Sequence, residues 1–293
     1  MVLDGRNDLV DGTIELGDHR TVGFATYGSP EGIPVIWCHG GPGSRKDPVH
    51  RDREAARAGL LLVGIDRPGY GMSTPLPGRT IADWIPDALA VVDELGVDRF
   101  VAIGESTGGA YALALGALVP KRSLGVVACC SLTDMRCEEA RSTMSRPHCH
   151  AVWDAADRRS ALSAAVDAHG VGGSNMTADG LGDALAPSDV ALFRDPEWAQ
   201  QAKAAFPAMF AQGLVGYTDD RLADGGGWVT FDVRSIVCPV TVLHGEEDRM
   251  CDVINAHHTA EIVPDARLAL YEELGHFSIE TKLIPAVQEL LTR

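Results

Sequence analysis

The sequence predicts an α/β protein with an open, mostly parallel sheet of eight strands, helices on both faces and a mainly helical insertion. Six short runs are apolar throughout instead of alternating, which is typical of parallel strands that are covered on both faces. Segments with helical periodicity alternate with these runs, as in a series of βα units. The alternation stops between residues 134 and 227 and then resumes.

The predicted elements follow one another in a regular order. A hairpin over residues 12–28, GTIEL and TVGFATYG joined by a polar turn, supplies the first two strands. The six apolar strands cover residues 35–38, 61–65, 100–103, 124–130, 240–243 and 268–271. Helices are predicted at residues 48–58, 81–95, 107–118, 252–262 and 279–291. This order places the carboxyl ends of the parallel strands at one edge of the sheet.

The segment 134–227 interrupts this order and is too long for a structureless loop. Helix-like pieces are predicted in it at residues 153–168, 188–192 and 196–210, with glycine-rich loops between them. We therefore divide the chain into a core domain, residues 1–133 and 228–293, and a helical cap, residues 134–227, inserted after the sixth strand. Its aromatic side chains form either an acyl pocket or the core of the cap itself.

Composition and charge exclude several classes of protein. The 293 residues carry a net charge of −16, so nothing in the chain would neutralise the phosphates of a nucleic acid. No apolar run approaches the roughly 20 residues that span a bilayer, and the acidic N-terminus does not resemble a secretory signal. Seven cysteines, several of them inside apolar runs, favour buried free thiols in the reducing cytoplasm. No nucleic acid and no membrane span are expected.

The motif GESTGG, residues 104–109, places Ser106 between the strand FVAIG and the start of a helix. A strand that turns directly into a helix brings two backbones together, so small residues are needed at Gly104 and Gly108. The corner residue takes a strained conformation that presents its hydroxyl, and the helix N-terminus is directed at the same place. This context predicts that Ser106 is a nucleophile instead of a residue in an ordinary glycine-rich turn.

A serine hydroxyl needs a general base and a group that orients this base. Asp248 follows the strand VTVLHG, and His276 follows the last strand, each at the sheet edge where Ser106 emerges. His276 is predicted to take the proton of Ser106 and pass it to the leaving group, while Asp248 orients the imidazole. Asp134, which follows the sixth predicted strand, is the alternative acid.

The loop HGGPGS, residues 39–44, follows the strand VIWC and is predicted to help stabilise an oxyanion. Its glycines allow backbone N–H groups to approach a substrate oxygen closely, and we assign the hole to the N–H groups of Gly41 and Thr107. His39 is interpreted as a packing residue beneath this loop. Asp66 and Arg67, in DRPGYG, are interpreted as residues of a structural turn. Glu105 is expected either to touch substrate or to form a salt bridge.

Five motifs together resemble the α/β-hydrolase superfamily, and the resemblance covers nearly the whole chain: HGGPGS at 39–44, DRPGYGMS at 66–73, GESTGG at 104–109, HGEEDRM at 244–250 and GHFS at 275–278. HGGPG is most similar to proline iminopeptidases, and GESxGG is similar to monoacylglycerol lipases and related esterases. Proline iminopeptidases usually carry an aromatic residue after the nucleophile, where this chain has Thr107. The resemblance therefore implies a carboxylesterase or lactonase-like hydrolase.

Neither a cofactor nor a metal is expected. The stretch PHCH, residues 147–150, contains metal-ligand types, but a structural metal needs four ligands and no second pair is present in the sequence. The leading hypothesis is a serine hydrolase that acts through an acyl-enzyme on Ser106, with a small-molecule ester as its partner.

Two alternatives remain open. The first is an aminopeptidase or amidase that holds an ammonium through an acidic residue of the insertion, such as Asp195, Glu197, Asp219 or Asp220. The second is a non-catalytic ligand-binding protein with the same fold. Carbon–carbon hydrolase and haloperoxidase-like activities fit the same catalytic set, and the sequence leaves the natural substrate and the oligomeric state open.

Overall fold

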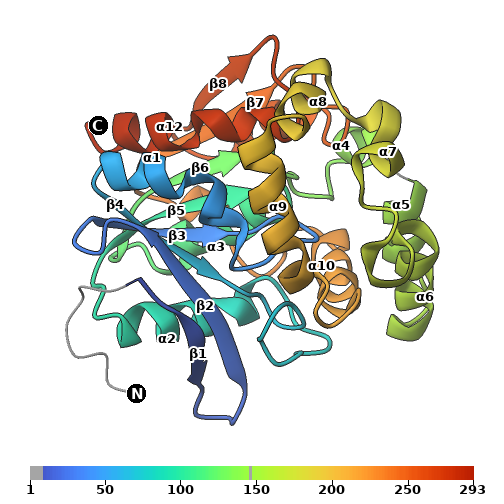
Figure 1. Cartoon of the computed structure of the whole chain (residues 1–293), viewed down its shortest axis with the longest axis horizontal. Coiled ribbons are helices and arrows are strands. Elements are labelled where there is room, and N and C mark those ends of the chain that lie inside the picture. Colours follow the sequence, from blue (N-terminus) through green and yellow to red (C-terminus); the bar gives the residue numbers. More distant parts are fainter. Residues whose placement is uncertain (1–8, 145–146) are drawn as a thin grey trace.

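A computed structural model describes residues 9–144 and 147–293 (Figure 1). These residues form one eight-stranded sheet with the order β1-β2-β4-β3-β5-β6-β7-β8. The pairs β1–β2 and β2–β4 are antiparallel, and every other neighbouring pair is parallel. The predicted fold class, a mostly parallel eight-stranded sheet, is confirmed.

The strands lie close to their predicted positions: β1 (Asp11–Glu15), β2 (Thr21–Gly28), β3 (Ile33–Cys38), β4 (Leu60–Ile65), β5 (Phe100–Glu105), β6 (Ser123–Cys129), β7 (Val240–Gly245) and β8 (Arg267–Tyr271). The helices outside the insertion are α1 (Asp52–Arg57), α2 (Ile85–Glu94), α3 (Gly108–Leu118), α11 (Ile254–Ile262) and α12 (Leu283–Leu290). Short 3₁₀ helices η1 (Asp47–Arg51), η2 (Ala82–Trp84) and η6 (Ser278–Lys282) directly precede α1, α2 and α12. The longer helices predicted there are each divided into a 3₁₀ turn and an α-helix.

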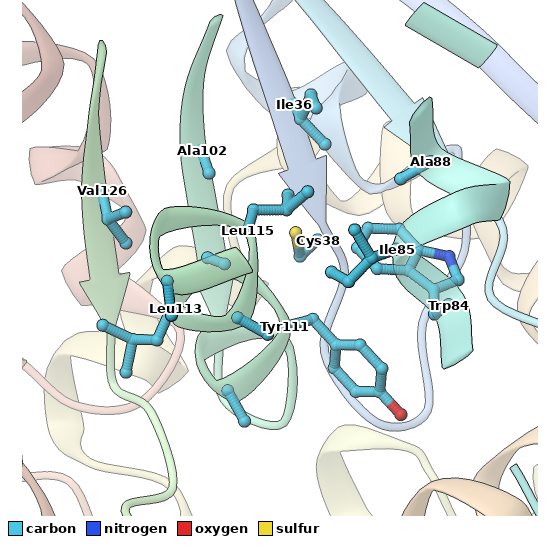
Figure 2. Close-up of a cluster of buried hydrophobic side chains, with 14 of the residues drawn as sticks. Ile36, Cys38, Trp84, Ile85, Ala88, Ala102, Tyr111, Leu113, Leu115 and Val126 are labelled. Carbon is cyan, nitrogen blue, oxygen red and sulfur yellow. The ribbon is translucent and has the colours of Figure 1, made fainter. Parts of the chain in front are cut away.

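One face of the sheet is covered by α2, α3 and α11. Figure 2 shows Ile36 and Cys38 of β3 facing Leu115 of α3, with Trp84 and Ile85 beside them. Alternate residues of each strand reach this cluster, since successive side chains of a strand point to opposite faces. The remaining residues of the same strands therefore have to be covered on the other side.

The opposite face is covered by α1 and α12. Val35 and Trp37 of β3 point to this side, where Leu283 and Val287 of α12 pack against the sheet. Burial on both faces explains why the strands are apolar throughout, and it makes the sheet a rigid platform for the loops at its edge.

Between β6 and β7 the chain forms mainly short helices: α4 (Glu138–Thr143), α5 (Pro147–Trp153), α6 (Arg158–His169), η3 (Val171–Gly173), α7 (Ala178–Leu181), η4 (Gly182–Ala184), α8 (Pro187–Phe193), α9 (Pro196–Met209), α10 (Val215–Gly225) and η5 (Val233–Ser235). The prediction of one helix over residues 153–168 is wrong, because α5 ends where that helix was to begin. Asp157 starts α6 by accepting a hydrogen bond from the backbone N–H of Ser160.

Helix α10 connects this segment to the loops at the carboxyl ends of the strands. Asp220 of α10 binds Arg67, which follows β4, and Arg221 binds Thr107, which follows β5. In Figure 1, α10 lies beyond the strand ends, close to α3. The division into a core, 1–133 with 228–293, and a cap, 134–227, remains a prediction. Within the described ranges, the helices lack the combination of length and apolarity that crossing a membrane requires.

Candidate active site

Ser106 stands at the corner between β5 and α3 with a φ of +50°. Such a left-handed conformation is strained for a residue with a side chain and requires support from its surroundings. The support comes from the backbone: the N–H of Ser106 donates to the carbonyl of Cys129 at 2.9 Å, and its carbonyl accepts from Gly109 at 3.1 Å. Ser106 is half-buried, so its hydroxyl is held at a fixed position while remaining accessible.

The glycines on either side of Ser106 allow the strand and the helix to meet. A Cβ on Gly104 would lie 2.2 Å from the carbonyl oxygen of Gly108. A Cβ on Gly108 would lie 2.0 Å from the carbonyl oxygen of Cys38, at the end of β3. Both contacts are with backbone, which cannot rotate away. The spacing of the motif is therefore set by the close approach of three backbone segments.

Replacing Gly108 by alanine is expected to destabilise the protein by about 3 kcal/mol, because the new methyl group overlaps a fixed carbonyl. Gly226 is the matched control, since it is exposed, has a φ of −82°, and nothing lies within 4 Å of a Cβ there. Urea unfolding of both variants measures the difference. Equal stability of Gly108→Ala and Gly226→Ala would contradict the close approach.

His276 and Asp248 form a buried pair. The Nδ1 of His276 lies 2.7 Å from Oδ2 of Asp248, and Oδ1 of Asp248 accepts from the N–H groups of Met250 and Cys251 at 2.8 and 2.9 Å. Burial alone would raise the pKa of Asp248, but His276 and the backbone donors outweigh it and hold this pKa below its ordinary value. An ionised Asp248 accepts the Nδ1–H of His276, which leaves Nε2 to exchange protons with a substrate.

Asp134 lies elsewhere. Its carboxylate accepts from the side chain of Arg136 and, at 3.2 Å, from the backbone N–H of Trp228. It borders a surface hollow of about 490 Å³ that is also lined by Arg136, Trp228, His258 and Ile262. The structure thus brings Asp248, and not the alternative acid Asp134, into contact with His276.

Asp189 of α8 holds the loop that carries His276, and sequence analysis did not find it. The fully buried carboxylate accepts from the backbone N–H groups of His276, Phe277 and Ser278 at 3.2, 3.0 and 2.8 Å. Gly275 permits this approach, since a Cβ there would lie 2.3 Å from Oδ2 of Asp189. The only sequence signal is an acidic residue in the first turn of a predicted helix, which usually serves that helix alone.

The glycine loop that follows β3 packs against Thr107, the residue after Ser106. A Cβ on Gly41 would lie 2.6 Å from Oγ1 of Thr107, so the two residues assigned to the oxyanion hole are neighbours. Arg67 fixes this loop by donating to the carbonyls of His39 and Gly40, the latter at 2.7 Å. With these carbonyls turned to Arg67, the loop is held in a single conformation.

His39 is buried beneath the same loop, as predicted. Its Nε2 accepts the N–H of Arg67 at 3.1 Å, so Nδ1 carries the proton and donates to the carbonyl of Gly40 at 2.7 Å. Burial, reinforced by the charge of Arg67, keeps the pKa of His39 well below its ordinary value. A neutral histidine with both nitrogens engaged is a structural residue.

Two buried thiols border the site and were not singled out in the sequence. Cys251 is buried beside Asp248, to whose Oδ1 its backbone N–H donates at 2.9 Å, and burial raises the pKa of its thiol well above the ordinary value. Cys130 lies beside the other two residues, since its sulfur and one donor atom each of Asp248 and His276 lie within 4.8 Å of one another. Protonated thiols of this kind behave as small apolar groups.

Glu105 does not form the salt bridge considered above with any described residue. It is 6% exposed, its Oε2 accepts from Nε1 of Trp37 at 3.0 Å, and its buried Oε1 has no partner among the described residues. Burial raises the pKa of Glu105 well above its ordinary value, and the charge of Glu280 adds to this rise. Burial therefore favours the protonated form of this carboxyl.

The folded protein keeps the Glu105 proton at pH values where the unfolded chain, with a pKa of 4.5, has released it. The contribution of Glu105 to stability is complete below pH 4.5 and declines as the pH rises, by up to about 1.4 kcal/mol per pH unit. We expect Glu105→Gln to gain stability relative to wild type between pH 5 and pH 8. Urea unfolding at several pH values tests this, with exposed Glu31→Gln as control, and parallel profiles for wild type and Glu105→Gln would contradict it.

The stretch 147–150 forms no metal site with the described residues. Cys149 is buried in an apolar cluster, and the ring of His150 packs edge-on against Trp153 at 5.2 Å. The side chain of His148 lies outside the described part of the structure. Among the described residues, the donor atoms close enough to share an ion belong to Cys130, Asp248 and His276, which include the predicted catalytic pair.

The fold and the comparisons with known proteins agree on the family of this chain. The chain belongs to the alpha/beta hydrolase fold family, whose model matches residues 33–283. A proline iminopeptidase of Xylella fastidiosa (strain 9a5c) is 25% identical over 94% of this chain and 93% of its own length. A proline iminopeptidase of Xanthomonas citri is 36% identical, but the match spans only 36% of this chain and 34% of that protein. The structure of Est816, described as an N-acyl homoserine lactone degrading enzyme, matches with 26% identity and a TM-score of 0.66 over 96% of this chain and 99% of that one.

Proposed function

We propose that this protein is a serine hydrolase that cleaves a carboxylic ester, open or cyclic, through an acyl-enzyme on Ser106. The observation that supports this most strongly is the arrangement of Ser106 in a strained φ of +50° at the strand–helix corner together with the His276–Asp248 pair at 2.7 Å. A serine that is held in this conformation without a catalytic role would be a cost to stability with no compensating gain.

In the proposed reaction, Nε2 of His276 takes the Ser106 proton as Oγ attacks the ester carbonyl. The tetrahedral oxyanion is stabilised by the backbone N–H groups of Gly41 and Thr107, next to the N-terminus of α3. His276 then gives its proton to the leaving alcohol, and the acyl group remains on Ser106. Water, deprotonated by His276, releases the acid and restores the hydroxyl. Asp248 stabilises the imidazolium in both steps.

An aminopeptidase that releases N-terminal proline is the second candidate, because proline iminopeptidases are among the relatives. Such an enzyme needs an acidic group to hold the ammonium of the substrate, but the four candidate acids named above have other partners. Asp219 binds Arg158, Asp220 binds Arg67 and Arg79, Asp195 caps α9, and Glu197 pairs with Arg53. This geometry favours the ester over the peptide.

The experiment compares p-nitrophenyl esters, a panel of lactones and proline β-naphthylamide on the wild type and on Ser106→Ala. We expect turnover of esters or lactones that is lost in Ser106→Ala, and labelling of Ser106 by a fluorophosphonate probe. Faster turnover of the naphthylamide than of every ester would favour the peptidase. Ester turnover that survives in Ser106→Ala would refute the mechanism, and failure of the probe to label Ser106 would favour a non-catalytic binding protein.

All seven cysteines are free, which agrees with a reducing compartment such as the cytoplasm.

A further inference from the structure

Arg221 of α10 reaches the corner that carries Ser106, although it belongs to a segment far away in the sequence. Its Nη2 donates to Oγ1 of Thr107, and the same nitrogen forms an ion pair with Asp224. The side chain is 3% exposed, and Oγ1 of Thr107 in turn faces Gly41. A guanidinium is therefore buried next to the two residues assigned to the oxyanion hole.

The hydrogen-bonding capacity of Arg221 is only partly used. Nε is completely buried and has no acceptor among the described residues. Arg67, in the same region, differs: its Nε, Nη1 and Nη2 all donate to the carboxylate of Asp220 or to the carbonyls of the glycine loop. A buried donor without an acceptor is costly, so the Nε–H of Arg221 is a group that a bound ligand or a water would satisfy.

The charges of this buried region do not balance. Arg67, Arg79 and Arg221 face the carboxylates of only two residues, Asp220 and Asp224. Burial raises the pKa of Asp224 to about 6 in spite of the attraction of Arg221, so this carboxylate is weakly held in its charged form. An uncompensated buried cation is unfavourable, and an anion bound beside it would remove the imbalance.

The surroundings of Ser106 are otherwise apolar. Leu132, Met135, Met144, Cys149 and Cys251 form a buried cluster against which Trp153 packs, and the N–H of Leu132 donates to the carbonyl of Ser106 at 3.3 Å. The guanidinium of Arg221 lies 5.4 Å from the ring centre of Tyr217, whose hydroxyl is 4.0 Å from the sulfur of Cys149 in this cluster. A ligand that fills this region would combine an apolar chain with one negative group.

We propose that Arg221 binds a carboxylate of the substrate, so that the preferred substrates are esters whose acyl chain ends in a carboxylate. This inference rests on the proposed ester hydrolysis at Ser106. The acyl side is chosen because the leaving alcohol must reach His276 to be protonated, whereas Arg221 contacts Thr107 on the oxyanion side. The Nε–H of Arg221, which has no acceptor among the described residues, would donate a charge-assisted hydrogen bond to the carboxylate.

The test uses matched pairs of esters that differ only in the terminal group. The p-nitrophenyl half-esters of glutarate, adipate and suberate are compared with p-nitrophenyl pentanoate, hexanoate and octanoate. The variants are Arg221→Gln and the double variant Arg221→Gln with Asp224→Asn. The double variant removes the carboxylate that Arg221→Gln leaves without its partner, and it is used in case the single variant folds poorly. Arg158→Gln is the control, since Arg158 pairs with Asp219 at the edge of the same helix and is partly exposed.

We expect wild type to hydrolyse at least one half-ester with a kcat/KM at least tenfold above that of its neutral partner. The double variant should lose at least tenfold more on that half-ester than on its neutral partner, while Arg158→Gln keeps the wild-type preference. Absence of a preference in the wild type, or an equal loss on both esters, would overturn the proposal. An equal loss would mean that Arg221 supports the oxyanion or the fold and does not bind a carboxylate.

A binding measurement separates this proposal from the proposed hydrolysis. Two proteins, Ser106→Ala and the double variant Ser106→Ala with Arg221→Gln, are titrated with adipate and with hexanamide in a calorimeter. Because Ser106 is absent from both, binding is measured without turnover. Adipate binding that disappears in Arg221→Gln supports the carboxylate site even if no ester is cleaved. Ester hydrolysis without any adipate binding would leave the hydrolase assignment intact and overturn the carboxylate site.

Discussion

Replacing His276 by glutamine is expected to lower kcat for the best p-nitrophenyl ester by about 10⁴-fold, with little change in KM. Glutamine fills a similar volume and keeps a donor for Asp248, but it cannot take the proton of Ser106. The loss falls on kcat because proton transfer occurs only in the transition state. Steady-state kinetics measure the loss of kcat, and mass spectrometry tests whether an acyl-enzyme forms. Near-wild-type kcat in His276→Gln would show that another base acts at this site.

A comparison of two aspartates identifies the acid of the pair. Asp248→Asn places an amide opposite Nδ1 of His276, disfavours the productive tautomer, and should lower kcat by about 10²- to 10⁴-fold. Asp134→Asn should leave kcat within about threefold of wild type, because Asp134 binds Arg136 and the backbone of Trp228. The reverse order of effects would assign the acid to Asp134. Circular dichroism of each variant excludes unfolding as the cause.

Replacing Asp220 by asparagine is expected to destabilise the protein by about 3–5 kcal/mol, the range for a broken buried ion pair. Asp220 is completely buried and its two oxygens accept from Arg67, Arg79, Tyr70 and Tyr111. Burial alone would raise its pKa, but the two guanidinium groups reverse this and hold it below its ordinary value. The asparagine variant leaves two buried cations without a carboxylate.

Asp220→Asn should also reduce kcat, by about tenfold to a hundredfold at temperatures where the variant is folded. Arg67 loses the partner that orients it, and Arg67 holds the carbonyls of His39 and Gly40 beneath the oxyanion loop. Small displacements of a site of this kind have effects of that size. Urea unfolding and kinetics measure the two effects, and Asp232→Asn, at an exposed pair with Arg234, is the control that should leave both unchanged. Loss of stability with full kcat would show that Asp220 holds the fold but not the loop.

The fold and the position of Ser106 could be predicted because their signals are local. Strands buried on both faces are apolar at every position, and a tight strand–helix corner requires glycine at Gly104, where a Cβ would meet the backbone of Gly108. Ser106, Asp248 and His276 follow the parallel strands β5, β7 and β8, so their positions at one edge of the sheet could also be predicted. These features were readable since each depends on a few neighbouring residues and on the rules of parallel sheets.

The tertiary structure decided what depends on residues far apart. Asp248 and Asp134 both follow strands, and only the packing of the loops brings Asp248 to His276. Asp189, Asp220 and Arg221 come from helices whose sequence predicts no more than polar positions, yet they hold the His276 loop, Arg67 and Thr107. Their partners lie many residues away, and such contacts follow from how α8 and α10 dock on the sheet. A buried charge is stable only where that docking supplies its counter-charge, so its role becomes visible only in three dimensions.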